Sequence, residues 1–227
     1  MASSRRPGLQ GRWRWVFDSL ESIIPIYERG SSRISLFSDS RMRAEVIEFA
    51  VDEGSLVLDL GSGPGTMAAL VAKAGGTPLL LDASMRMLRA ARGADKVQAV
   101  FEHLPFREGT FASVVAGFSL RDSMDLVTAL GEVARVTKRG GRFSFCDLGK
   151  SDSYGRAVVL GAYIRVAAPL IGAMTGGRNG LRFGSLFETY LLTLPNGSLA
   201  RLLRRFFSDV SLRADRLGGS IVVRCVE

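Results

Sequence analysis

Three glycines and two carboxylates in the first half of the chain form the clearest chemical pattern in the sequence. Gly61, Gly63 and Gly65 lie in the stretch LDLGSGPGT, directly after an apolar run, and Asp59 precedes the first glycine by two residues. A strand that leads into glycines and then a helix brings backbone N–H groups close to a ligand, because no Cβ blocks the approach. Asp82 follows at the end of the next expected strand. Dinucleotide enzymes and methyl-donor enzymes both use such a loop.

The spacing of the glycines separates these two classes. The dinucleotide fingerprint requires G-x-G-x-x-G, whereas residues 61–66 place the third glycine one position early. A carboxylate at Asp59 would repel a pyrophosphate, but it could meet a cationic amino-acid group directly or through water. Asp82 is placed to accept hydrogen bonds from two ribose hydroxyls. Adenosine joined to a cationic amino acid is S-adenosylmethionine, which we predict as the cofactor.

Short apolar runs alternate with helical patterns around these residues. We expect strands at 56–60, 78–82, 97–101, 112–117 and 141–147, and helices at 66–73, 84–92 and 123–137. This alternation predicts an α/β fold with a mostly parallel sheet and helices on both faces. Beyond it we expect an apolar lid segment at 157–174, a glycine-rich loop at 175–180, a helix at 198–206 and strands at 209–212 and 220–225.

Composition fits a single globular domain. The chain has 227 residues, of which 47% are hydrophobic, and no apolar run reaches the roughly 18 residues of a spanning helix. The N-terminus lacks an apolar signal core, so we expect a cytoplasmic protein. Cys146 and Cys225 lie in apolar, strand-like runs. We therefore expect buried thiols rather than a disulfide, and we predict no metal site.

The formal net charge of +8 permits an anionic lipid, nucleic acid or substrate as partner. Near the N-terminus four arginines surround two tryptophans: Arg5, Arg6, Arg12 and Arg14 with Trp13 and Trp15. Such a cluster suits a peripheral membrane contact, and it equally suits a solvated terminus. A nucleic-acid partner is not expected, because no base-gripping tetrad follows the fourth strand and no RNA-binding module is recognisable.

Several motifs extend the pattern along the chain. They are residues 103–106 with 109–111, 118–122, 135–142 and 147–150, and upstream residues 16–19, 27–29, 35 and 43. In these motifs the chain resembles the class I S-adenosylmethionine-dependent methyltransferases, and within them the UbiE-type C-methyltransferases of ubiquinone and menaquinone synthesis. The resemblance implies a Rossmann-like fold and a polyprenylated quinol as acceptor. It divides the chain into an N-terminal cap (1–54), a cofactor core (55–150), a lid (151–196) and a C-terminal part (197–227).

We expect the cofactor to contact thirteen residues: Asp59, Gly61, Ser62, Gly63, Pro64, Gly65, Asp82, Ala83, Met87, Phe101, Glu102, Gly117 and Phe118. Val100 and Phe101 stand where the family has a polar pair, so the backbone or Glu102 would have to meet the adenine amino group. For the acceptor we expect contacts from Tyr27 of the cap and Tyr163 of the lid. The apolar lid positions around Tyr163 recur at helical spacing, which suits either an isoprenoid tail or a plain core.

Methyl transfer is an in-line displacement, so the protein mainly has to position two reactants. For a quinol, a group beyond the fourth strand should remove the phenolic proton or stabilise the oxyanion. Arg121 is expected to stabilise the phenolate, directly or by orienting a water, and Asp122 to orient Arg121 or accept a proton through water. Alternatively, Asp122 caps a helix and Arg121 forms a surface ion pair. His103, the only histidine, is expected on a nearby loop without serving as the base.

Other functions remain open at this point. The acceptor could be another small hydrophobic or phenolic molecule, because the lid decides its identity. The chain could also be a non-catalytic homologue that binds the cofactor structurally or not at all. A dinucleotide oxidoreductase conflicts with the glycine spacing and with Asp59.

Overall fold

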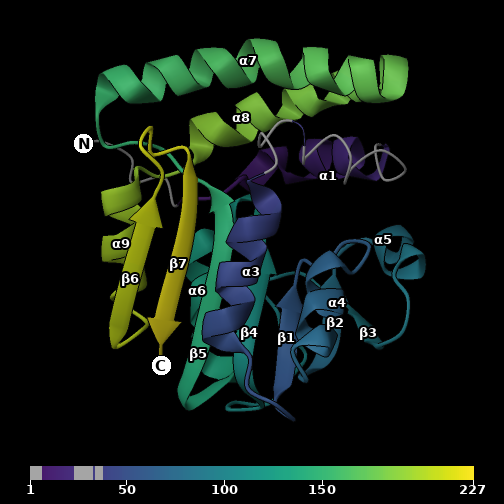
Figure 1. Ribbon diagram of the computed structural model, residues 1–227, viewed down its shortest axis with the longest axis vertical. Coiled ribbons are helices and arrows are strands. Elements are labelled where there is room, and N and C mark those ends of the chain that lie inside the picture. Colours follow the sequence, from purple (N-terminus) through teal and green to yellow (C-terminus); the bar gives the residue numbers. More distant parts are fainter. Residues whose placement is uncertain (1–6, 23–32, 34–37) are drawn as a thin grey trace.

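A seven-stranded sheet forms the centre of the protein (Figure 1). The computed structural model describes residues 7–22, 33 and 38–227. The sheet has the order β3-β2-β1-β4-β5-β7-β6. Its strands are β1 (Leu56–Leu60), β2 (Thr77–Asp82), β3 (Asp95–Gln98), β4 (Phe111–Gly117), β5 (Thr137–Leu148), β6 (Asp209–Ala214) and β7 (Ser220–Val226). The first five run parallel, and β7 and β6 pair antiparallel. The predicted mostly parallel sheet is confirmed.

Helices cover both faces of the sheet. On one face lie α3 (Asp39–Ala50), α4 (Thr66–Lys73) and α5 (Met85–Ala90), and on the other α6 (Leu126–Val136) and α9 (Asn196–Leu203). Successive side chains of a strand point to opposite faces. Thus Val57 of β1 packs with Val46 of α3, whereas Leu58 packs in the cluster that holds Leu130 of α6.

A third group of helices crosses the carboxyl ends of the parallel strands (Figure 1). It comprises the 3-10 helix η1 (Gln10–Arg12), α1 (Trp13–Ser22), α7 (Tyr154–Gly176), the 3-10 helix η4 (Gly177–Gly184) and α8 (Ser185–Leu192). Within the described residues, one helical stretch, Tyr154–Leu192, has the length and apolar composition of a membrane-crossing helix. Figure 1 shows this stretch folded back on itself, with α8 returning beneath α7. Ligands of open α/β sheets bind at this edge, so these helices cover the expected site.

Several predicted elements have other bounds in the structure; for example, the strand predicted at 141–147 begins at Thr137, and the helix predicted at 198–206 ends at Leu203. The third strand ends at Gln98 rather than at residue 101, because the chain turns after the Ala99 N–H donates to the Asp82 carbonyl. The helix predicted from residue 123 begins at Leu126, because the Asp125 side chain accepts from the next backbone N–H groups. The loop expected at 175–180 lies mostly in η4.

One glycine of this expected loop, Gly180, serves close packing against Gly172 of α7. A Cβ on Gly172 of α7 would overlap the carbonyl oxygen of Gly180 in η4. The hairpin between α7 and α8 therefore needs small residues at its inner contact.

The predicted state of the cysteines is confirmed. Cys146 and Cys225 are free and buried, and burial raises the pKa of each thiol to about 12. Such thiols act as small apolar side chains. Predictions for Arg5, Arg6, Tyr27 and Ser35 fall outside the described residues.

Candidate active site

A cavity of about 100 Å³ lies at the carboxyl ends of β1, β2 and β4, beneath α1. Its lining includes all the predicted cofactor residues except Asp59 and Gly65: Gly61, Ser62, Gly63, Pro64, Asp82, Ala83, Met87, Phe101, Glu102, Gly117 and Phe118. We call it the cofactor cavity. It brings together residues that span nearly sixty positions of the sequence, because adjacent parallel strands end at the same edge.

The backbone amides of the glycine loop donate hydrogen bonds to the end of β2. The N–H groups of Gly61 and Ser62 both donate to the Leu81 carbonyl, and the Gly63 N–H donates to Asp82. The expectation that these amides face a ligand is therefore wrong for these three. What the glycines provide is close approach, since a Cβ on Gly61, at φ +69°, would lie 2.5 Å from the Ser119 Cβ. A loop with its amides already used does not offer a pyrophosphate site.

Asp82 joins the loop to the end of β2 and faces the cofactor cavity. Its Oδ2 accepts from the Gly63 N–H at 2.8 Å and its Oδ1 from the Ser84 N–H at 2.8 Å. Each carboxylate oxygen can accept a second hydrogen bond, so both remain available to ribose hydroxyls. Burial raises the pKa of Asp82 above its usual value, and the nearby Glu21 carboxylate adds to the rise.

Asp59 lies beneath the loop instead of in the cavity lining. It is fully buried, and its Oδ2 accepts from the Ala68 N–H of α4 at 2.9 Å. Burial raises its pKa to about 7, which the Ala68 hydrogen bond and the charge of Arg43 partly oppose. Asp59 therefore fastens α4 to β1, and the predicted direct contact with the cofactor has no support in this arrangement. Gly65, also outside the lining, is the N-cap of α4.

Arg43 of α3 is a cavity residue that the cofactor prediction missed. Its side chain is buried, and its guanidinium carbon lies 5.1 Å from the ring centroid of Phe118. No hydrogen-bond partner for its Nε is found among the described residues. A buried cation with an unused donor fits a carboxylate of the ligand. The resemblance named Arg43 only as a residue of the N-terminal cap, because it reaches the cofactor cavity through the packing of α3 and not through the glycine loop.

Two hydroxyls of the lining resemble Arg43 in this respect. Ser62 Oγ and Ser123 Oγ are buried and, within the described part of the chain, have no hydrogen-bond partner. Buried polar atoms without partners are rare in folded proteins. Together with Arg43 they indicate a polar ligand, which fits the amino-acid and nucleoside groups of the predicted cofactor.

Glu102 has a structural role beside the cavity. Its Oε1 accepts from the backbone N–H groups of Met124 at 2.7 Å and Asp125 at 3.0 Å. The carboxylate therefore holds the segment that carries Ser123, and this oxygen already has two donors. An adenine contact by Glu102 would have to use its other oxygen.

The N-terminal arginine and tryptophan cluster folds partly onto the protein. Trp13 lines the cofactor cavity and stacks on Phe17, with ring centroids 4.9 Å apart. Arg12 Nη1 lies 2.5 Å from Glu188 of α8. Of the two tryptophans, Trp15 is the one that remains exposed. The membrane contact of this cluster stays a prediction, with Trp15 as its more exposed tryptophan.

A second cavity of about 550 Å³ adjoins the first, and we call it the acceptor chamber. The two share Val16, Leu20, Phe118 and Asp122. Most of its apolar lining comes from the lid: Val159, Leu160, Tyr163, Ile164, Phe183 and Leu186. Tyr163 thus lies where an acceptor contact was predicted. A large apolar space that meets the cofactor cavity suits a hydrophobic acceptor.

Phe118 stands at the junction in an unusual backbone conformation. Its φ is +63°, in the left-handed region that non-glycine residues rarely adopt. This conformation lets its carbonyl accept from Arg121 while its ring faces Arg43. Strain of this kind is retained where the surrounding contacts fix it, which is common at functional sites.

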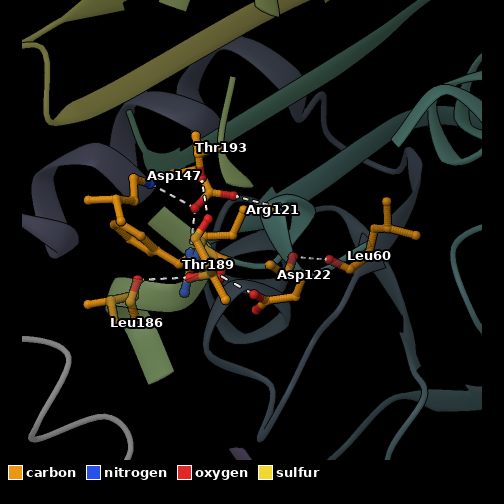
Figure 2. A network of polar contacts seen from close by, with 10 residues as sticks. Leu60, Arg121, Asp122, Asp147, Leu186, Thr189 and Thr193 are labelled. Atoms are coloured by element: carbon orange, nitrogen blue, oxygen red, sulfur yellow. Dashed lines mark hydrogen bonds and ion pairs between the residues drawn. The ribbon is translucent and has the colours of Figure 1, made fainter. Parts of the chain in front are cut away.

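Arg121 is held in a buried ion pair with Asp147 (Figure 2). Its Nη1 lies 2.5 Å from Asp147 Oδ1 and donates to the Phe118 carbonyl at 2.7 Å, and the side chain is 9% exposed. The alternative of a surface ion pair is therefore wrong. Asp147 was not among the predicted site residues, although its place at the end of β5, beside the other strand ends, is a signal that could have identified it.

Asp122 ends the 3-10 helix η3 (Leu120–Asp122) and lines both cavities. Its Oδ1 lies 3.7 Å from Arg121 Nε. Burial raises the pKa of Asp122 to about 6, and Arg121 opposes this rise. Asp125, and not Asp122, caps α6, with Oδ1 accepting from Val127 and Thr128. A carboxylate that titrates near pH 6 is suited to accept a proton at neutral pH.

Neither a histidine nor a metal enters this arrangement in the described residues. His103 is exposed and lies outside the lining of both cavities. Across residues 7–22, 33 and 38–227, no group of three or more His, Cys, Asp or Glu side chains could hold a metal ion.

Comparison with known proteins identifies the family. A model described as "Methyltransferase domain" matches residues 58–145. Demethylmenaquinone methyltransferase of Mycobacterium sp. (strain KMS) is 31% identical over 157 residues, which is 68% of each chain. The enzyme of that name from Thermobifida fusca (strain YX) is 34% identical over 145 residues, 59% of this chain and 61% of that one.

Solved structures show the same fold. A SAM-dependent methyltransferase from Thermotoga maritima, described as a possible histamine N-methyltransferase, superposes with a TM-score of 0.66 over 93% of this chain and 99% of that one, at 18% identity. The methyltransferase in complex with the Trm112 activator from Haloferax volcanii gives 0.60 over 90% and 96%, at 16% identity. The chain belongs to the class I S-adenosylmethionine-dependent methyltransferases and, within them, to the UbiE-type family.

Proposed function

We propose that this methyltransferase binds S-adenosylmethionine in the cofactor cavity and methylates a ring carbon of a polyprenylated quinol of the menaquinone or ubiquinone type. The observation that carries the proposal is the apolar acceptor chamber, which meets the cofactor cavity at Phe118 and Asp122. The names of the relatives, demethylmenaquinone methyltransferases, favour a quinol among hydrophobic acceptors.

The residues of the cofactor cavity would hold the cofactor by its polar groups. Arg43 meets the carboxylate, Asp82 accepts from the ribose hydroxyls, and Ser62 and Ser123 provide further polar contacts. Trp13 and Phe101 supply apolar walls. When bound, S-adenosylmethionine supplies a methyl group on a sulfonium, which is an electrophile.

On the acceptor side, Asp122 accepts the phenolic proton of the quinol, directly or through a water. The electron pair of the broken O–H bond stays on the oxygen and raises the electron density of the ring. Arg121, positioned by Asp147, stabilises the resulting phenolate. As the new C–C bond forms, the bond between the methyl group and the sulfonium sulfur would break and leave its electron pair on sulfur. The proton of the methylated ring carbon would then pass to a water, and aromaticity would be restored.

Calorimetry tests the cofactor part of the proposal. We expect micromolar binding of S-adenosylmethionine and S-adenosylhomocysteine, binding weakened by about a hundredfold in Asp82→Ala, and no binding of NADH. Absence of binding by the wild-type chain would contradict it and would favour a non-catalytic homologue.

Methyl transfer to a demethylmenaquinol with a short prenyl tail tests the acceptor. We expect a product heavier by one CH2 unit, because a methyl group replaces a ring hydrogen, and turnover should be reduced in Asp122→Asn. Turnover with a tailless phenol but none with any prenylated quinol would favour another small phenolic acceptor.

A further inference from the structure

The outer side of α7 is apolar, and no helix or strand of the described residues packs on it. Five large apolar side chains on it, defined here as the outer face of α7, are each more than half exposed: Val158, Val159, Val166, Leu170 and Met174. Scattered exposed apolar residues need no explanation, but a row along one helix marks an interaction surface. In Figure 1, α7 forms the top edge of the molecule and has other helices only beneath it.

Helix geometry shows that this face points away from the protein. Residues two positions apart lie about 200° apart around an α-helix. Val166 and Leu170 follow the buried Ile164 and Ala168 by two positions, and Ile164 and Ala168 pack with Phe183 beneath. Because its inner side is packed on the protein in this way, α7 can lie on a membrane but not cross one in this fold.

The charges around α7 indicate which kind of surface it meets. Residues 154–184 contain four arginines and no aspartate or glutamate. All four, Arg156, Arg165, Arg178 and Arg182, are exposed. An apolar helix face accompanied by cations alone is complementary to anionic phospholipid headgroups over an acyl core.

The acceptor chamber opens next to this surface. Val159 and Tyr163 of α7 both line the chamber and are solvent-exposed. A hydrophobic acceptor could pass between these two side chains. It would then move from the outer face of α7 directly into the chamber, without crossing the polar surface of the sheet.

We propose that the outer face of α7 rests on an anionic lipid bilayer, toward which the acceptor chamber opens at Val159 and Tyr163. The opening rests on the proposed function, whereas the docking of α7 does not. Membrane contact is thereby assigned to α7 instead of the N-terminal cluster, from which Trp13 turns into the cofactor cavity.

Vesicle flotation of the full chain tests the docking without any acceptor. We expect the wild-type chain to float with vesicles of phosphatidylglycerol and phosphatidylcholine, and only weakly with phosphatidylcholine alone. Val166→Glu/Met174→Glu should lose flotation, because removing even one inserted valine weakens binding by about tenfold. The matched control Leu56→Glu/Met85→Glu changes two exposed apolar residues far from α7 by the same charge and should float like the wild type.

The arginines give a second readout. Arg178→Gln/Arg182→Gln should weaken binding to the anionic vesicles by about thirtyfold and leave the weak binding to phosphatidylcholine unchanged. Retained S-adenosylmethionine binding by each variant would show that it is folded.

Flotation that is absent in the wild type, or equal in the α7 and control variants, would overturn the proposal. A wild-type dimer that Val166→Glu/Met174→Glu dissociates, with no vesicle binding, would assign the face to a second copy instead. Failure of the quinol assay with flotation intact would refute the proposed acceptor and leave the docking standing.

Discussion

The cofactor cavity and the acceptor chamber adjoin one another but are built in different ways. The cofactor cavity is formed largely by strand ends and the short loops that follow them, at Gly61, Asp82 and Phe118. The acceptor chamber is about five times larger and depends on the lid helices α7 and α8. The cofactor cavity is therefore determined by the fold common to methyltransferases. The acceptor chamber is determined by helices that can vary while the fold remains the same.

The two cavities meet at residues that belong to both. Phe118 and Asp122 follow β4, so the common fold places them, yet they face the space that the lid encloses. Substitutions at this junction should lower the rate of methyl transfer. Substitutions elsewhere in one cavity should weaken only the binding of the cofactor or only the binding of the acceptor.

The largest effect is expected at the junction. Asp122→Asn removes the proposed base while keeping the size of the side chain, so kcat should fall by about a thousandfold. Because the carboxylate is not among the groups proposed to hold the cofactor, the Kd for S-adenosylmethionine should change by less than about threefold. Steady-state kinetics and calorimetry on the same preparation measure both. A variant that keeps a tenth of the wild-type kcat would refute the role of Asp122.

The pH dependence sharpens this test. Since burial raises the pKa of Asp122 to about 6, kcat/KM of the wild type should fall by about tenfold per pH unit below that value. The fold binds this proton more tightly than the unfolded chain does, so protonation favours folding. The contribution of Asp122 to the free energy of unfolding should therefore rise as the pH falls from about 6, the pKa in the folded protein, to 3.8, the usual pKa of an aspartate. Both dependences should be absent in Asp122→Asn, as rate profiles and urea unfolding at several pH values would show.

A smaller effect, confined to the binding of the cofactor, is expected from Asp82→Ala. The variant loses two proposed contacts to the ribose and two hydrogen bonds that shape the loop, so the Kd for S-adenosylmethionine should rise by about a hundredfold. Asp95→Ala, at the exposed start of β3, is the control and should bind like the wild type. Calorimetry decides between them, and a rise of less than about fivefold would show that Asp82 is not a cofactor ligand.

The difference between the two cavities also explains what the sequence could predict. Eleven of the thirteen expected cofactor residues line the cofactor cavity, because the strand pattern and the glycine loop are local signals and parallel strands end at one edge. Asp59 differs because alternation along β1 turns its side chain beneath the loop toward α4. Arg43 was missed because tertiary packing alone brings α3 to the cavity.

The lid was predicted only as an apolar insertion. The glycines of residues 175–180 suggested an irregular loop, whereas Gly180 packs closely against Gly172 of α7 and lets the chain fold back on that helix. Sequence spacing could not tell which lid residues face the chamber, since α7 is apolar around its whole circumference. The structure separates Leu160 and Ile164, which face inward, from Val166, which faces outward.

A substitution on α7 tests that separation. Val159→Trp places a larger side chain at the mouth of the acceptor chamber and should raise the KM for a tailed quinol by about tenfold, which corresponds to about 1.4 kcal/mol of lost binding. The Kd for S-adenosylmethionine should not change. Val166→Trp makes the same substitution on the outer face of α7 and should leave both constants unaltered. Equal KM values for the two variants would mean that the acceptor does not enter beside Val159.

The smallest effect is expected at Asp125, three residues beyond the proposed base. Its Oδ1 accepts from the Val127 and Thr128 N–H groups at the start of α6. Asp125→Ala should therefore lower the free energy of unfolding by about 1 kcal/mol, as measured by urea denaturation. Because this carboxylate lines neither cavity, kcat and the Kd for the cofactor should stay at wild-type values. The capping role considered for Asp122 in the sequence would then belong to Asp125, and Asp122 would act in the chemistry. A loss of kcat in Asp125→Ala without a loss of stability would break that distinction.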